Sequence, residues 1–545
     1  MRRLALLFPL VLTACQSATA PAPAISIDTM KQVDQTLASD AFEGREPGTP
    51  GEAKTLAYIV DRFQKAGLQP GNHGSWFQDV PLVEITAKNV SPLTFTLPGK
   101  PALSLAYGPD MTVATYRVTP HIAVKDSDVV FVGYGINAPE KQWNDYAGVD
   151  VKGKTVVILV NDPDWSKPDV GGTFNGRAMT YYGRWTYKYE EAARQGAAAA
   201  IIVHQTAPAA YPWKVVQSSW TGSQQVADAA NGHMDTVPAL AWMQLGFAEK
   251  LFAEAGQDFH ALEAAAARPG FKAVPLGAKA SVSFDNDIHK HSSKNVIGVL
   301  PGKAAPDETV LLSAHWDHLG HCTPAPDRDD ICNGAIDNAS GVAALVALAE
   351  ANVKAGPARR SLVFIALTAE ESGLLGSDYY GANPVYPLDK TVGGVNMDAL
   401  KFSGPARNMI VVGKGKSELD GVLDKVLAAQ NRVATPEATP EKGEYYRSDH
   451  FSFAKRGVPM LNAEGGDDLV KGGKAAGAAY ARDYEENRYH GPKDEYDPNW
   501  DWSGVKQDVE AYYAVARALA DGSDWPNWVA GDEFRAIRDK SRAGK

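Results

Sequence analysis

TVLLSAHWDH, residues 309–318, is the stretch of sequence that decides the fold. Its apolar part, Thr309 to Ser313, is typical of a strand buried on both faces, and it ends at a cluster of polar side chains. In open α/β sheets, ligands bind at the carboxyl ends of the strands. His315 and Asp317 follow such an end, so we interpret them as candidate site residues.

Two later buried runs also end in carboxylates. Glu370 and Glu371 follow the run 361–368, and Asp398 follows the run 394–397. Adjacent carboxylates repel each other unless they share a cation or a proton. The pair Glu370-Glu371 therefore indicates a metal site or a general acid–base site.

Two further candidates lie outside the predicted strands. Asp337 directly precedes a predicted helix, where alone it could be a helix cap. His490 lies in a loop ahead of the final predicted helix. With the strand-end residues, the inventory fits two zinc ions that share one carboxylate, each also binding one histidine and one further carboxylate.

The whole chain predicts an α/β fold with an insertion. From about residue 293, strand and helix patterns alternate to the end, which predicts a mostly parallel sheet with helices on both faces. Residues 51–66 predict an amphipathic helix that ends at Gly67. Between these parts the pattern is rich in β-type runs. We therefore expect one split domain, residues 24–90 and 289–545, with a β-rich insertion at 91–288.

The N-terminus carries an export pattern. Two arginines at positions 2 and 3 precede the apolar run 4–12, which is too short to span a bilayer. Leu12-Thr13-Ala14-Cys15 resembles the lipobox of bacterial lipoproteins, so residues 1–15 are expected to be a signal peptide with Cys15 as the lipidated residue. Gln16 points to the periplasmic side of the outer membrane; the alternative is an ordinary signal peptide on a periplasmic or secreted protein.

Composition and charge limit the classes of protein to which this chain can belong. The 545 residues, 44% apolar and 22% charged, are long enough for two or three globular domains. A net charge of -11 without long basic runs argues against a nucleic-acid partner. Cys322 and Cys332 are the remaining cysteines, and an oxidising compartment favours a disulfide between them.

The order His-x-Asp, Asp, Glu-Glu, Asp, His resembles the co-catalytic zinc exopeptidase family, which includes bacterial leucyl aminopeptidases, aminopeptidase Y and glutamate carboxypeptidase II. The likeness extends to FEGREPGT at 42–49, KNVIG at 294–298 and SDH at 448–450. DYAGVDVKGK at 145–154 resembles the protease-associated domain that several members carry as an insertion. The resemblance implies a zinc exopeptidase fold with such a domain capping the cleft.

The family pattern implies a ligand set for two Zn²⁺ ions. Asp337 would be the carboxylate that bridges both ions. His315 and Asp398 would complete one site, and Glu371 and His490 the other.

Three further roles follow from the same resemblance. Asp317 would accept a hydrogen bond from His315 and orient its ring. Glu370 would be the general base, and Tyr489 would donate a hydrogen bond to the developing oxyanion. His318 has no ligand role in the pattern, so we expect it to support or pack against the site.

The expected activity is release of N-terminal residues from peptide substrates. A free α-amine can be met by acidic residues near the metals, and no basic cluster for a C-terminal carboxylate stands out, Arg447 being the exception. Arg184 and Trp185 in the insertion are either substrate contacts or packing. Carboxypeptidase, dipeptidase, a glutaminyl cyclase-like transferase and a metal-free binding module remain alternatives, and the sequence predicts no oligomeric state.

Overall fold

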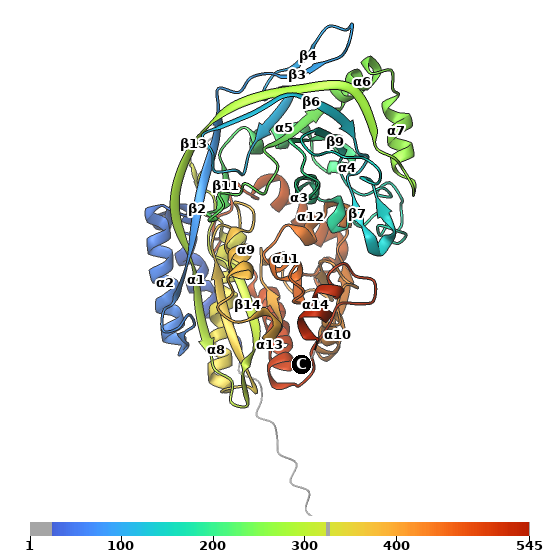
Figure 1. Cartoon of the computed structure of the whole chain (residues 1–545). Coiled ribbons are helices and arrows are strands. Elements are labelled where there is room, and N and C mark those ends of the chain that lie inside the picture. Colours follow the sequence, from blue (N-terminus) through green and yellow to red (C-terminus); the bar gives the residue numbers. More distant parts are fainter. Residues whose placement is uncertain (1–23, 323–327, 544–545) are drawn as a thin grey trace, which may run out of the picture.

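The computed structural model describes residues 24–322 and 328–543 (Figure 1). Cys15 and the rest of the predicted export signal lie outside the described residues. Within the described ranges, no helix has both the length and the apolar character needed to cross a membrane.

A mixed sheet with a parallel centre forms the larger layer. β17 (Arg360–Leu367), β14 (Ala305–His315), β18 (Thr391–Asn396) and β21 (Met460–Gly465) lie side by side and parallel in that order. β13 (Val274–Leu300) pairs antiparallel with β17 on one side. On the other side β19 (Asn408–Val411) pairs antiparallel with β21 and parallel with β20 (Val433–Pro436). The predicted α/β class is confirmed.

Helices cover both faces of this sheet. Successive residues of β14 point to opposite faces, so Val310 and Leu312 enter one core and Leu311 the other. The first face is covered by α1 (Ile27–Leu37), α2 (Pro50–Ala66), α8 (Ser340–Ala355) and α13 (Trp502–Asp521). The second is covered by α9 (Leu375–Ala382) and α11 (His450–Ala454). α2 ends at Gly67 (φ 95°), as its apolar spacing predicts.

The insertion has its own mixed sheet. Its order is β5 (Met111–Ala114), β12 (Ala239–Gln244), β10 (Ala199–His204), β9 (Thr155–Leu159) and β6 (His121–Phe131), followed by the first part of β13. The three pairings from β12 to β6 are parallel. α3 (Trp185–Arg194) packs against β10.

A two-stranded ribbon joins the insertion to the rest of the molecule. β2 (Phe77–Lys88) pairs antiparallel with residues 285–296 of β13, and Figure 1 shows β13 running without a break from one part to the other. The expected junction at 288/289 therefore falls inside a strand. Since a paired ribbon bends less readily than a loop, it holds the insertion over the sheet edge.

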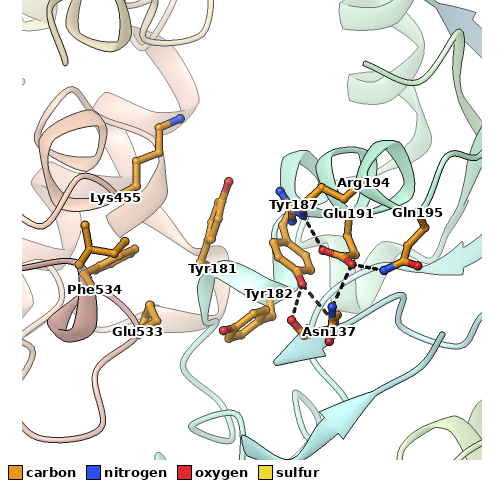
Figure 2. A pocket seen from close by; sticks show the side chains of 11 residues that line it. Asn137, Tyr181, Tyr182, Tyr187, Glu191, Arg194, Gln195, Lys455, Glu533 and Phe534 are labelled. Carbon is orange, nitrogen blue, oxygen red and sulfur yellow. Dashed lines mark hydrogen bonds and ion pairs between the residues drawn. The ribbon is translucent and has the colours of Figure 1, made fainter. Parts of the chain in front are cut away.

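The insertion also touches the loop before α11. The backbone N–H of Met179 donates to the carbonyl of Pro440 at 3.2 Å, and Arg177 forms an ion pair with Glu441 at 3.0 Å. A cavity of about 380 Å³ is lined by residues of both parts of the molecule, among them Tyr181 of the insertion and Lys455 (Figure 2). The insertion thus contacts the rest of the molecule both through the β2–β13 ribbon and at the loop before α11.

Candidate metal centre

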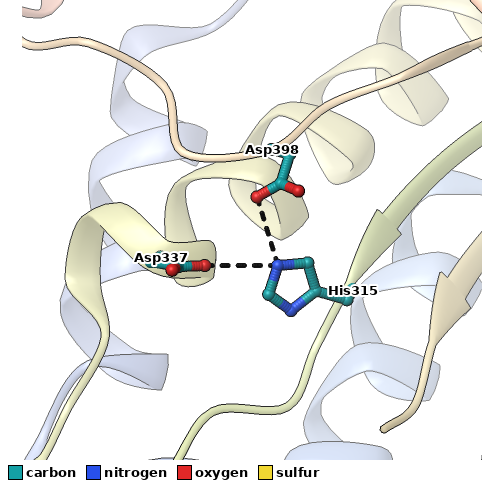
Figure 3. A group of neighbouring side chains, drawn as sticks. All are labelled: His315, Asp337 and Asp398. Carbon is teal, nitrogen blue, oxygen red and sulfur yellow. Dashed lines mark hydrogen bonds and ion pairs between the residues drawn. The ribbon is translucent and has the colours of Figure 1, made fainter. Parts of the chain in front are cut away.

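His315 and Asp398 come from the carboxyl ends of the neighbouring strands β14 and β18. The Nε2 atom of His315 lies 3.2 Å from an Oδ1 atom of Asp398 and 3.2 Å from Oδ1 of Asp337 (Figure 3). Asp337 reaches this point from the segment that enters α8. Three predicted site residues therefore converge.

The other carboxylate oxygen of Asp337 faces the remaining two candidates. His490 Nε2 lies 3.4 Å from Asp337 Oδ2 and 3.1 Å from Glu371 Oε2. Glu371 follows the end of β17, and His490 lies in the loop after α12 (Gly473–Asn487). All five predicted ligands are thus brought together, with Asp337 between the two histidines.

These separations suit metal coordination. Ligand atoms about 2.0 Å from a tetrahedral zinc ion are about 3.3 Å from one another. The distances of 3.1–3.4 Å among the five side chains match that spacing. Three carboxylates and two imidazoles are also the donor types that zinc accepts. The residues present therefore fit two ions that share Asp337.

Electrostatics favours a cation at the same place. Burial lowers the pKa of His490, but the carboxylates of Glu371 and Asp337 outweigh burial and raise that pKa to about 10. Burial also lowers the pKa of His315, but the nearby carboxylates, Asp398 first among them, raise it well above its usual value. The cluster thus attracts positive charge, either as protons or as metal ions.

Three residues beside the cluster have a left-handed backbone conformation. His490 has a φ of 54°, Ala369 before Glu370 has 52°, and Ala399 after Asp398 has 50°. Residues with side chains occupy this left-handed region at a cost, which the surrounding structure has to hold. Such positions gather at functional sites, in agreement with the placement of the five side chains.

The predicted role of Asp317 needs correction. Its carboxylate lies 3.8 Å from His315 Nδ1, which instead donates to the backbone carbonyl of Asp317 at 3.1 Å. The carboxylate accepts from the backbone N–H groups of Glu370 (3.2 Å) and Glu371 (3.4 Å). The backbone carbonyl of Asp317 already accepts the hydrogen bond of the His315 ring. The buried Asp317 carboxylate therefore holds the backbone of the glutamate pair instead.

His318 lies closer to the centre than its lack of a predicted ligand role suggests. Its Nδ1 donates to Glu371 Oε1 at 2.6 Å, and its ring lies 5.8 Å from that of His490. With Asp337 and Glu371 it forms a second group of side chains that could bind a metal ion. The signal was present in the sequence, since HWDH places two histidines three residues apart at one strand end.

Two buried residues for which no role was predicted hold the ligand-bearing loops in place. Arg45 donates to the carbonyls of Trp316 (2.9 Å) and Gly334 (2.9 Å), one in each ligand-bearing loop. Asp494 accepts from the backbone N–H of Asp337 at 3.0 Å. Arg45 lies in FEGREPGT at 42–49, one of the stretches that resemble the zinc exopeptidase family, and this was the available signal.

The two candidate catalytic groups flank the cluster. Glu370 is buried, and burial raises the pKa of its carboxyl well above the usual value while the charge of His315 opposes that rise. Tyr489 is 39% exposed and stacks on His490 with ring centroids 3.8 Å apart. A proton-accepting group and a hydroxyl donor therefore lie beside the ligands.

A disulfide closes the loop after the first ligand. Cys322 and Cys332 are bonded, with Cα atoms 6.0 Å apart. Cys332 belongs to β16 (Ile331–Cys332), which pairs with β15 (Gly320–His321). The bond thus ties the segment after His315 to the segment before Asp337.

Parts of this chain are similar to known proteins. Residues 295–514 match the model of peptidase family M28. The chain is 32% identical over 144 residues to aminopeptidase NAALADL1 of Mus musculus, covering 25% of this chain and 18% of that protein. It is 30% identical over 209 residues to leucine aminopeptidase 1 of Arthroderma gypseum, covering 36% and 52%. The aminopeptidase from Aneurinibacillus sp. strain AM-1 aligns over 92% of this chain and 95% of its own, with 20% identity and a TM-score of 0.49.

The fold and the site define an α/β protein with a histidine and carboxylate cluster at the carboxyl edge of its sheet. Residues 295–514, which match the model of peptidase family M28, contain all five candidate ligands. The chain spans 18% and 52% of the length of the two curated relatives.

Proposed function

We propose that this protein is a zinc-dependent aminopeptidase. The observation that carries the proposal is the position of Asp337, whose two carboxylate oxygens face His315 and His490 separately. A carboxylate placed in this way suits a bridge between two ions. The M28 match and the names of the curated relatives support the same activity.

Five side chains would hold two zinc ions. Asp337 would bridge them, with His315 and Asp398 on one ion and Glu371 and His490 on the other. Zinc, when bound, polarises a carbonyl group and lowers the pKa of water to about 7. The M28 match supports zinc, and the spacing of the side chains supports the count of two.

Glu370 moves the proton in this proposal. Its carboxylate accepts a proton from the attacking water and passes it to the nitrogen of the leaving amine. The backbone N–H group of Glu370 donates to buried Asp317, which fixes the start of its side chain relative to the strand end.

Tyr489 stabilises the oxyanion in this proposal. Its hydroxyl can donate a hydrogen bond to the oxygen that becomes negative during attack. The ring stacks on His490, which keeps the hydroxyl beside the cluster, and its partial exposure leaves room for a substrate.

The site and its cap would act outside the cytoplasm. The lipobox pattern ending at Cys15 supports export and attachment to the outer membrane, with the protein on the periplasmic side. The insertion would serve as the protease-associated cap, which its contacts with the 440 loop support. Detergent phase partitioning of the full chain tests the anchor: the wild type should enter the detergent phase, and Cys15→Ser should stay in the aqueous phase.

A set of blocked peptides tests the activity. Purified protein would be incubated with free, N-acetylated and C-amidated peptides, with and without a chelator, and the products read by mass spectrometry. We expect stepwise loss from free N-termini that chelation abolishes. Trimming from the C-terminus would replace the proposal with a carboxypeptidase, and cyclised N-termini would replace it with a transferase.

A further inference from the structure

A short segment of the insertion, residues 177–181, runs beside residues 438–451 of the main domain. The backbone contact with Pro440 described above joins these two segments. Arg177 adds a hydrogen bond to the carbonyl of Ala438 at 3.0 Å. We call residues 177–181 the bracing segment, because it holds the other segment at more than one point.

The bracing segment also contributes to a hydrophobic cluster of the main domain. The ring centroid of Tyr181 lies 5.2 Å from that of Phe451 and 6.1 Å from that of Tyr446. Rings at these separations attract each other. Met179 is buried in the same cluster, and a Cβ atom added at Gly443 would lie 2.6 Å from its sulfur. Two side chains of the insertion thus pack into a core whose other described members belong to the main domain.

The turn beneath Tyr181 carries the group that holds a candidate metal ligand. Ser448 donates from its hydroxyl to Asp398 Oδ2 at 2.5 Å, and its carbonyl accepts from the backbone N–H of Phe451 at 3.0 Å. The other oxygen of Asp398, Oδ1, lies 3.2 Å from His315 Nε2. The ring against which Tyr181 packs therefore belongs to the turn that places the Ser448 hydroxyl.

Buried charged groups hold the bracing segment inside the insertion. The carboxylate of Asp162 accepts from the backbone N–H and the hydroxyl of Thr180 at 2.7 and 2.8 Å. Lys188 of α3 is fully buried and donates to the carbonyl of Asn161 at 3.0 Å. Hydrogen bonds between buried groups therefore fix the backbone next to Tyr181, so its ring is presented to the main domain from a fixed support.

We propose that Tyr181 is a positioning residue for the metal centre: it holds the turn of Ser448, and Ser448 orients Asp398. This inference rests on the proposed function, in which Asp398 binds a zinc ion. Under it the insertion does more than cap the cleft, because one zinc site needs the bracing segment to keep its carboxylate in place.

The two zinc sites should depend on the insertion to different degrees. The contacts of Glu371 and His490 described above are all with residues of the main domain. Only the site of His315 and Asp398 is linked to the bracing segment by the contacts listed here. A change at Tyr181 should therefore weaken one zinc ion selectively, whereas a general loss of stability would affect both.

The test compares zinc binding by variants of the purified protein, measured by competition with a chelating dye. Tyr181→Leu removes the ring, and Tyr181→Phe keeps it. Tyr182→Leu is the matched control, because the ring of Tyr182 packs on Phe174 and Tyr187 within the insertion. Ser448→Ala removes the last link of the chain and gives the size of the direct effect.

We expect Tyr181→Leu to bind one of the two zinc ions about tenfold more weakly, the low end for loss of a group that orients a ligand. The other ion should change by less than about threefold, as expected for an independent site. Tyr181→Phe and Tyr182→Leu should bind both ions like the wild type. The double variant Tyr181→Leu/Ser448→Ala should lose no more than Ser448→Ala alone, because both changes break the same chain of contacts.

A milder variant covers the case in which loss of the ring prevents folding, which thermal unfolding of the zinc-free protein would show. Arg177→Gln removes the hydrogen bond to Ala438 and the ion pair with Glu441. It should weaken the same ion by about two- to threefold, the scale of an exposed ion pair. Combined with Ser448→Ala, it should again add nothing.

The outcomes separate this inference from the function beneath it. If folded Tyr181→Leu binds both ions like the wild type, or if its loss adds to that of Ser448→Ala, the insertion does not position Asp398, while the peptidase proposal stands. Equal weakening of both ions would likewise overturn the inference. A wild type that binds no zinc and cleaves no peptide would overturn the proposed function, and the inference with it.

Discussion

The Oδ2 atom of Asp494 accepts a hydrogen bond from the backbone N–H of Asp337 at 3.0 Å, and this joins two ligand-bearing segments. Oδ1 of Asp494 accepts from the N–H of Ile336 at 2.9 Å. Asp494 follows His490 by four residues, so the same loop carries one candidate ligand and holds the backbone of another. The relative position of Asp337 and His490 therefore depends on Asp494.

Asp494→Ala should weaken zinc binding by about 10- to 100-fold, the usual effect of removing a group that orients a ligand. Zinc affinity would be measured by competition with a chelating dye. Asp497→Ala, three residues further along the chain, is the control and should bind zinc like the wild type. Unchanged affinity in Asp494→Ala would show that Asp337 is oriented without it.

Glu370→Gln should retain zinc and thermal stability while losing at least about 100-fold in kcat, because an amide cannot accept the proton. Turnover of a free-N-terminus peptide and zinc content would be measured on the same preparation. Glu350→Gln, on α8 and paired with Arg62 at 3.1 Å, is the matched control and should keep full activity. Full activity in Glu370→Gln would assign the base to another group.

Local patterns were sufficient to place three of the five candidate ligands. Strand ends are visible in sequence as apolar runs that stop, and the carboxyl ends of parallel strands meet at one edge of a sheet. His315, Glu371 and Asp398 could therefore be placed together from the order of the strands. Asp337 and His490, which lie in loops, needed the family pattern.

Contacts between distant segments could not be predicted in this way. Arg45 holds loops about 270 and 290 residues away, and nothing in its neighbourhood indicates them. β13 continues through the expected domain boundary at 288/289 because it pairs with β2 there. The alternation of apolar and polar residues in the sequence does not define which strands pair. His315 donates its hydrogen bond to the backbone carbonyl of Asp317 and not to the side-chain carboxylate. Both acceptors belong to the same residue, so the sequence does not distinguish between them.

His450 should make the protein acid-sensitive. It is fully buried, and burial lowers its pKa to about 3, although the backbone of Tyr445 opposes that change. An unfolded histidine has a pKa of about 6.5, so below that pH the unfolded state binds a proton that the folded state does not. The stability contributed above pH 6.5 is therefore lost as the pH falls towards 3.

The size of this loss follows from about 1.4 kcal/mol per pH unit. Between pH 7 and pH 5 the wild type should lose about 2 kcal/mol more unfolding free energy than His450→Phe, measured by urea denaturation. His73→Phe, at an exposed histidine, should follow the wild type. Parallel losses in wild type and His450→Phe would mean that His450 is protonated in the folded state.

The double variant Cys322→Ser/Cys332→Ser should be less stable by about 2–3 kcal/mol, since the bond restricts the unfolded chain over a short loop. Urea denaturation with and without a reductant would measure this. The reductant should shift the wild type towards the double variant and leave the double variant unchanged. Equal midpoints for both proteins under oxidising conditions would argue against the bond in solution.

The central claim is that Asp337 is shared by two zinc ions, and elemental analysis tests it most directly. Wild type, Asp337→Ala and the surface control Asp424→Ala would be loaded with zinc, dialysed and counted for zinc per chain. We expect two ions in the wild type and the control, and fewer than one in Asp337→Ala, because removal of a bridge weakens both sites. Two ions retained by Asp337→Ala would contradict the shared carboxylate.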